Sequence, residues 1–287
     1  MRLADPLDQA SGLRRLFTPE PTFQALGVLG ADARRTARAC TALALGLGRQ
    51  GHRVMVMDET RAPNNVAGLL GILPRYGLVD AASRGLAAVV RPALEGMVLL
   101  AAPDGLHTLA GLSEHALLDM ADAWKTRDDP PEWLLHNGGD GPIHSQGLAT
   151  TANLRVLVLP ANRAALADAY AVMKSAQTAW SGHLWFVMVE GVEDGAALTL
   201  FASLSETAQR FLNVKPVFLG CLAREKPGAQ PDAVEPALIE MLNRAGGHHA
   251  QIERIDFEQY WQRMWLFSRM SAESASHQTR KGRQRAG

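Results

Sequence analysis

The chain has 287 residues, of which 47% are hydrophobic and 20% are charged, so it can bury one large core or two modest ones. Its acidic and basic residues balance to a formal net charge of zero, which gives no electrostatic reason to expect direct binding of nucleic acid. No apolar run approaches the roughly 18 residues that cross a membrane, and the polar first residues do not predict a signal peptide.

The two cysteines, Cys40 and Cys221, lie in apolar surroundings without CxxC spacing. This pattern predicts reduced cysteines and a cytoplasmic protein. The histidines lack spaced carboxylate or cysteine companions, so we expect no resident metal ion.

The first 17 residues predict a short helix outside the main domain. Asp5 suits the N-cap and Pro6 the first helical position. Apolar residues then recur at helical spacing: Leu7, Ala10, Leu13 and Phe17. The Pro-containing residues 18–22 end the helix and act as a linker. Two interpretations stay open, because the helix could pack on its own domain or dock on a partner, as amphipathic helices do.

Residues 23–60 predict a strand–helix–strand unit around which the remaining chain is organised. We expect a strand over 23–29, a polar loop over 30–36, a helix over 37–48, and a second strand over 53–58 that stops on Asp58. Such a unit requires parallel strands and a right-handed crossover.

The loop over 30–36 stands where α/β folds bind phosphates, yet Gly30 is its one glycine. A phosphate loop needs glycines that turn backbone N–H groups inward, and a lysine that reaches the phosphates. Ala31 and Ala33 oppose left-handed backbone by about 1–2 kcal/mol each. Asp32 would repel each unit of phosphate charge by about 3 kcal/mol at ~5 Å and an effective dielectric of about 20.

Three residues of the same loop could still serve a nucleotide. Arg34 and Arg35 supply cations, and Thr36 could hold a magnesium ion. The sequence therefore leaves open a loop that binds Mg-ATP and a loop that has lost this ability.

Strands and helices alternate through the rest of residues 23–247. Further strands are expected over 96–102, 132–136, 154–159, 184–189 and 217–220, and helices over 77–94, 106–124, 164–180 and 195–212. This alternation predicts one α/β domain with a doubly wound, mostly parallel sheet of about seven or eight strands.

The fourth strand is followed by Asn137, where nucleotide hydrolases of this architecture place an aspartate that orients magnesium. A neutral amide cannot replace that charge. Asp140 lies three residues further along and is a weaker substitute.

Residues 248–270 predict an amphipathic helical segment, followed by a basic tail over 271–287 that we expect to be disordered. The broad apolar face of this segment comprises Phe257, Trp261, Met264, Trp265 and Phe267. One interpretation packs this helix on the core. The other lays it in the plane of a membrane, where the tail is attracted to anionic lipid.

Several segments resemble one protein family. Residues 8–14 match the DQAxxLR signature of FlhG/FleN proteins, MinD-like ATPases that control flagellar number and placement. Further similarity covers residues 50–58, Asn65, and the helices over 168–174 and 208–212, so the resemblance runs from residue 8 to about residue 220.

The resemblance implies a MinD/ParA-like P-loop fold and several partners. The amino-terminal helix of the family docks on the FlhF GTPase and stimulates hydrolysis. The matching contact and helix-shaping residues here are Asp8, Gln9, Ala10, Leu13 and Arg14. The family's ATPase domain dimerises around ATP, its carboxyl-terminal helix attaches to the inner membrane, and members touch flagellar switch components or a transcription activator. The resemblance thus implies a cytoplasmic protein with peripheral membrane attachment at the cell pole.

The chain departs from the family at its ATP site. The KGGxGKST loop aligns with residues 30–37, where Arg35 replaces the phosphate-binding lysine and Gly30 replaces the lysine that reaches across the dimer. Asp58 is retained, whereas Thr60 replaces the second switch carboxylate and Asn137 replaces the magnesium-orienting aspartate.

The adenine-contacting position near 189–190 is not clearly kept. We therefore expect a vestigial site at Gly30, Arg35, Thr36 and Asn137, with Asp58 as the one catalytic candidate. No cofactor is expected. The alternatives are a weak Mg-ATP-dependent ATPase that dimerises and binds membrane, with Thr36 as magnesium ligand, and a membrane-associated scaffold.

Overall fold

The structure is a computed structural model that describes residues 23–125, 130–138, 147–181, 183–191, 194–224, 232–248 and 256–285. The predicted helix over 1–17, the linker over 18–22 and Asp140 lie outside these residues. Within the last helix, side chains are described as far as Ser276.

The centre of the molecule is an eight-stranded sheet with the order β3-β4-β2-β5-β1-β6-β7-β8. All neighbouring strands are parallel except the edge pair of β3 and β4. The strands are β1 (Gln24–Gly30), β2 (Val54–Asp58), β3 (Arg91–Pro92), β4 (Val98–Ala101), β5 (Trp133–Asn137), β6 (Leu154–Pro160), β7 (Leu184–Glu190) and β8 (Val217–Leu222). The predicted fold class is confirmed.

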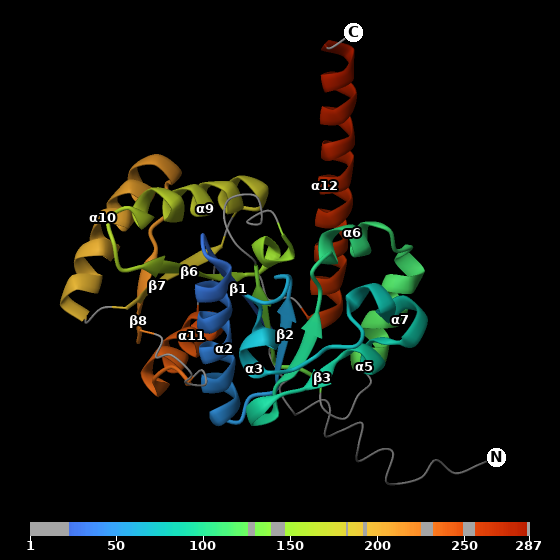
Figure 1. Cartoon of the computed structure of the whole chain (residues 1–287), viewed down its shortest axis with the longest axis horizontal. Coiled ribbons are helices and arrows are strands. Elements are labelled where there is room, and N and C mark those ends of the chain that lie inside the picture. The colour runs from blue at the N-terminus through green and yellow to red at the C-terminus, as the bar shows by residue number, and fades with distance from the viewer. Residues whose placement is uncertain are drawn as a thin grey trace.

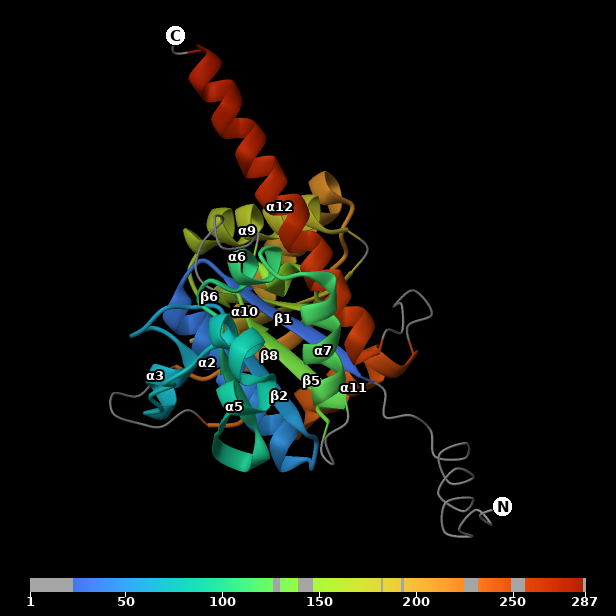
Figure 2. The ribbon, with the colours of Figure 1, turned by 90° about the vertical axis from the view of Figure 1, so that its right-hand side faces the viewer.

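Helices cover both faces of this sheet (Figures 1 and 2). One face carries α2 (Ala33–Arg49), α3 (Val66–Leu70) and α11 (Pro236–His248). The opposite face carries α4 (Ala81–Arg84), α5 (Leu86–Val89), α6 (Gly105–Ala110), α7 (Glu114–Lys125), α9 (Ala165–Ala179), α10 (Asp194–Leu212) and α12 (Phe257–Arg285). Three short 3₁₀ turns, η1 (Leu78–Asp80), η2 (Leu94–Gly96) and η3 (Leu148–Thr151), join these elements.

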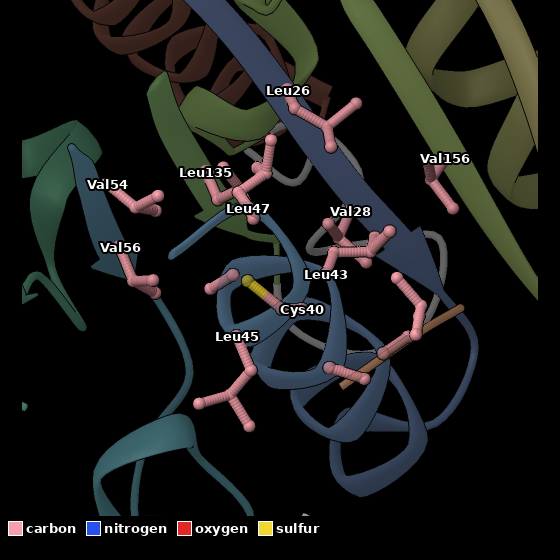
Figure 3. Packing of buried hydrophobic residues seen from close by; sticks show 14 of the residues in the cluster. Leu26, Val28, Cys40, Leu43, Leu45, Leu47, Val54, Val56, Leu135 and Val156 are labelled. Carbon is pink, nitrogen blue, oxygen red and sulfur yellow. The ribbon is translucent and has the colours of Figure 1, made fainter. Parts of the chain in front are cut away.

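The helix α2 packs closely on the sheet (Figure 3). Twelve of its 17 residues are buried, which its run of alanine and leucine permits because small side chains let a helix lie close to a sheet. Leu43 and Leu47 pack with Leu26 and Val28 of β1 in this core. Because α2 is held in this core, the short connection from the end of β1 to the start of α2 is held in place as well.

Two predicted helices are interrupted. The region over 77–94 forms η1, α4 and α5 and then the antiparallel strand β3, because Gly85 adopts a φ of 79° between the two helices. The helix over 106–124 divides into α6 and α7, and the Ser113 hydroxyl caps α7 by accepting from the Ala116 amide at 3.2 Å.

The carboxyl-terminal helix α12 is part of the core. Phe257, Trp261, Trp265 and Phe267, which the membrane interpretation assigned to lipid, are all at most 9% exposed. The first three of them join the cluster formed with α6 and α7, and Phe267 packs edge-on against Trp180. In this structure these side chains face protein, which agrees with the interpretation that packs the helix on the core.

The end of α12 differs from expectation in a second way. The structure continues the helix to Arg285, whereas the sequence predicted a disordered tail from residue 271. Figures 1 and 2 both show this half of α12 projecting beyond the rest of the domain. Among the described residues, no helix is long and apolar enough to cross a membrane.

The burial of α12 predicts a specific loss of stability. Trp261→Ala is expected to lower the free energy of unfolding by about 3–5 kcal/mol, because it removes a large, fully buried side chain. The matched control is Leu266→Ala on the same helix, where the side chain is 51% exposed and a change within about 0.5 kcal/mol is expected. Urea denaturation followed by circular dichroism measures both. Equal effects would show that α12 does not belong to the core.

Candidate functional site

The carboxyl ends of four parallel strands bring three predicted site residues and Glu190 to one edge of the sheet. Asp58 ends β2, Asn137 ends β5, Gly30 ends β1 and Glu190 ends β7. In open α/β sheets this edge is where ligands bind. The neighbouring order β2-β5-β1-β6-β7 places the first three on adjacent strands.

The connection from β1 to α2 is much shorter than the sequence predicted. Only Ala31 and Asp32 separate the strand from the helix, in place of a polar loop over 30–36. Asp32 is the N-cap, with extended backbone at φ −130° and ψ 114°, and its carboxylate accepts from the Arg35 amide at 2.9 Å. The residues with positive φ all lie outside 30–36. The helix therefore begins four residues early, because Asp32 caps it and no glycine holds the backbone open.

Thr36 lies inside this early turn. Its hydroxyl donates to the Asp32 carbonyl at 2.7 Å, and the residue is fully buried. Gly30 lies directly over it: a Cβ added at Gly30 would come within 2.6 Å of the Thr36 hydroxyl oxygen. The structure thus brings these two predicted site residues together, but as a packed helix start rather than as a loop around an anion.

Arg35 and Arg38 both reach Glu190. An Arg35 guanidinium nitrogen lies 2.5 Å from one carboxylate oxygen, and Arg38 donates to the other. Arg38 also donates to the Ala223 carbonyl at 3.0 Å. Because Glu190 is buried and Arg38 nearly so, this carboxylate offsets one of the two positive charges that a bound phosphate would otherwise meet.

Asp58 and Asn137 form a second set of contacts, in which the buried Asn137 Oδ1 has no hydrogen-bond partner among the described residues. The Asn137 amide donates to Asp58 at 2.8 Å and to the Thr60 hydroxyl at 3.0 Å. The other Asp58 oxygen accepts from the Val66 amide at 2.7 Å, so this carboxylate caps the start of α3. Burial raises the pKa of Asp58 to about 6, although its hydrogen bonds from Asn137 and from backbone amides act in the opposite direction.

The residue after Asp58 extends this set of contacts to α12. Both Glu59 oxygens accept from amides at the start of η3, from Leu148 at 2.7 Å and from Ala149 at 2.8 Å. Beside them, the Tyr260 hydroxyl of α12 lies 3.0 Å from a His136 ring nitrogen and 3.2 Å from the Thr151 hydroxyl. The last helix is therefore hydrogen-bonded to the same sheet edge.

The described residues do not fit Mg-ATP in this arrangement. The first turn of α2 is capped by a carboxylate, Thr36 is turned into its own helix, and Glu190 holds Arg35. Both carboxylate oxygens of Asp58 already accept hydrogen bonds, one from the start of α3 and the other from Asn137. Among the described residues, no group of three or more His, Cys, Asp or Glu side chains could hold a metal ion.

The structure places Gly30, Thr36, Asp58 and Asn137 at the expected edge, and it brings Asp58 and Asn137 into contact. Arg35, predicted at the phosphate-binding position, contacts Glu190 and Asp32. Sequence reasoning missed the roles of Glu190, Arg38 and Glu59. A carboxylate directly after a buried strand was the available signal for Glu190, because Asp58 shows the same pattern. The partner-binding residues Asp8, Gln9, Ala10, Leu13 and Arg14 lie outside the described residues.

Comparison with known proteins gives a likeness of fold. No family model and no curated protein matches the sequence. A plasmid partition protein from Borrelia burgdorferi is similar with a TM-score of 0.50 and 12% identity, over 78% of this chain and 99% of that chain. A ParA family ATPase from Chlorobium tepidum is similar with a TM-score of 0.50 and 11% identity, over 84% of this chain and 98% of that chain. The MinC:MinD complex from Aquifex aeolicus is similar with a TM-score of 0.48 and 14% identity, over 87% of this chain and 96% of that chain.

These likenesses establish the fold and nothing narrower. The chain shares its fold with the plasmid partition protein and the ParA family ATPase. Identities of 11–12% do not distinguish one subfamily from another.

The raised pKa of Asp58 predicts how stability depends on pH. Its ordinary value is 3.8 and its folded value is about 6, so the folded state binds the proton more tightly. Protonated Asp58 therefore adds to the free energy of unfolding below about pH 4, and this addition is lost as the pH rises through 6. Between about pH 4 and pH 7, the free energy of unfolding of the wild type should fall by on the order of 2 kcal/mol relative to that of Asp58→Asn. Urea denaturation across this range measures the difference, and parallel curves for the two proteins would contradict it.

The ion pairs of Glu190 give a further prediction. Glu190→Gln should lower the free energy of unfolding by about 2 kcal/mol, because the largely buried Arg38 loses its counter-charge while solvent screens the half-exposed Arg35. The matched control is Asp232→Asn, which breaks the exposed pair with Arg49 and should change little. Chemical denaturation followed by tryptophan fluorescence compares the two. A loss no larger than that of the control would remove Glu190 as the neutralising group.

Proposed function

We propose that this chain is an FlhG-like regulator of flagellar number and placement that acts as a binding protein. In this proposal the helix over 1–17 docks on an FlhF-type GTPase and stimulates its GTP hydrolysis. Gln9, Leu13 and Arg14 lie at the contact, while Asp8 and Ala10 shape the helix. Flagellar switch components, a transcription activator and the inner-membrane surface at the cell pole are further partners that the resemblance suggests.

One observation carries the proposal: a complete DQAxxLR match precedes a sheet edge whose groups bind one another. A nucleotide-driven switch needs free amides at the start of α2 and a carboxylate available to magnesium. Here Asp32 caps α2 and Asp58 caps α3. A protein that has kept the docking signature while closing this edge is best explained as a partner-activating protein.

The weak-ATPase alternative draws less support from the same geometry. It requires Thr36 to turn its hydroxyl outward and Arg35 to leave Glu190. Those changes break contacts that the folded chain already makes, so the binding free energy of the nucleotide would have to offset their loss.

The GTPase assay tests the proposal with the full chain. We expect a several-fold rise in GTP hydrolysis by the FlhF-type partner, and the same rise with or without Mg-ATP, because the closed edge does not need a nucleotide. Gln9→Ala should reduce the rise. Its matched control, Gln209→Ala, changes an exposed glutamine on α10 and should not.

Two outcomes would count against the proposal. No stimulation by a saturating concentration of the full chain, or equal stimulation by the chain lacking residues 1–17, would remove the docking role. Stimulation that requires Mg-ATP and is lost in Thr36→Ala would instead favour the ATPase alternative.

A further inference from the structure

A groove of about 540 Å³ separates α9 from α12. The first part of α12 packs against α6 and α7, and the far end of the helix projects from the domain (Figure 2). The groove is lined from α9 by Ala171, Lys174, Ser175, Thr178 and Ala179, and from α12 by Phe267, Met270, Ser271, Ser274 and Ala275.

Both walls of this groove suit the apolar side of another helix. Small residues recur every four positions on α9, at Ala171, Ser175 and Ala179, which allows a neighbouring helix to approach closely. The hydroxyls of Ser271 and Ser274 donate to carbonyls of their own helix, both at 2.9 Å. These donors are therefore already satisfied, and an apolar side chain can cover them at little cost.

The start of the described chain lies beside this helix. The Phe23 ring centroid is 5.3 Å from that of Phe257 and 5.6 Å from that of Tyr260. The groove begins at Phe267, about 15 Å further along α12. The five residues 18–22 can span up to about 17 Å, so a segment that precedes them can reach the groove.

We propose that this groove is the docking surface for residues 5–17 of the same chain. Their apolar stripe would fill the groove, and the exposed Lys174 on its rim suits the acidic residues Asp5 and Asp8. The short tether makes this contact intramolecular, which favours it over docking in the groove of a second copy of the chain.

The proposal deepens the proposed function and rests on it in one respect, because a segment held in the groove is withheld from the GTPase. The contact itself can be measured without the GTPase. A failure of the groove contact is therefore distinguishable from a failure of GTPase activation.

The tether fixes the direction in which the segment lies. Residue 17 is nearest to Phe267, so the segment runs antiparallel to α12. A helix rises about 1.5 Å per residue, which places Ala10 beside Ser274, since each lies seven residues from the matched end.

Disulfide formation in the full chain tests this register. Ala10→Cys with Ser274→Cys, in a Cys221→Ser background, should form an intramolecular disulfide about tenfold faster than a control pair, a gain that proximity in one register provides. The control pair is Ala10→Cys with Ser203→Cys, an exposed position on α10. Cys40 is buried and does not interfere.

Two surface substitutions then distinguish an effect of blocking the groove from a general effect of changing α12. Met270→Glu, at a groove residue that is 58% exposed, should return the rate to that of the control pair. Leu266→Glu, at a similarly exposed residue outside the groove lining, should leave the fast rate unchanged. Equal rates for the two cysteine pairs would overturn the proposal. Disulfides that form only between chains would also overturn it and would assign the groove to a second copy.

Discussion

The carboxylate of Asp32 at the start of α2 is the constraint on which the rest of the sheet edge depends. It satisfies an amide that a phosphate loop would aim at its ligand, and so the helix begins directly after the strand. Thr36 then falls within the first turns and turns its hydroxyl backwards, and the arginines that follow face Glu190. Each of these groups is satisfied by the protein, so the start of α2 leaves no open phosphate loop at this part of the edge.

The same edge is joined to the end of the chain. Asp58 and Glu59 are successive residues, yet the first caps α3 and the second caps η3. Tyr260 brings α12 to η3 and to His136 on the neighbouring strand. In a switch protein these segments would move apart and together with the ligand. Here hydrogen bonds within the protein hold them in one arrangement.

Sequence patterns predicted the central strands well, because each is a short apolar run that a turn or a polar residue ends. They also placed Asp58 and Asn137 at one edge, since parallel strands present their carboxyl ends together. The start of α2 was misplaced, because the polar character of residues 30–36 indicated a loop, whereas Asp32 caps a helix that begins at Ala33. Glu190 could not be paired with Arg35 and Arg38 from sequence, because 152 positions or more separate them and only the sheet order brings them together. The burial of the α12 aromatics likewise depends on α6 and α7, whose partners periodicity alone does not reveal.

The contact between Phe23 and Phe257 joins the first described residue of the chain to a helix near its end. The core on that face also takes Tyr260, Trp261 and Trp265. During synthesis this core stays unfilled until α12 has left the ribosome. Over that interval the unpaired apolar face of β1 and β2 is open to chaperones.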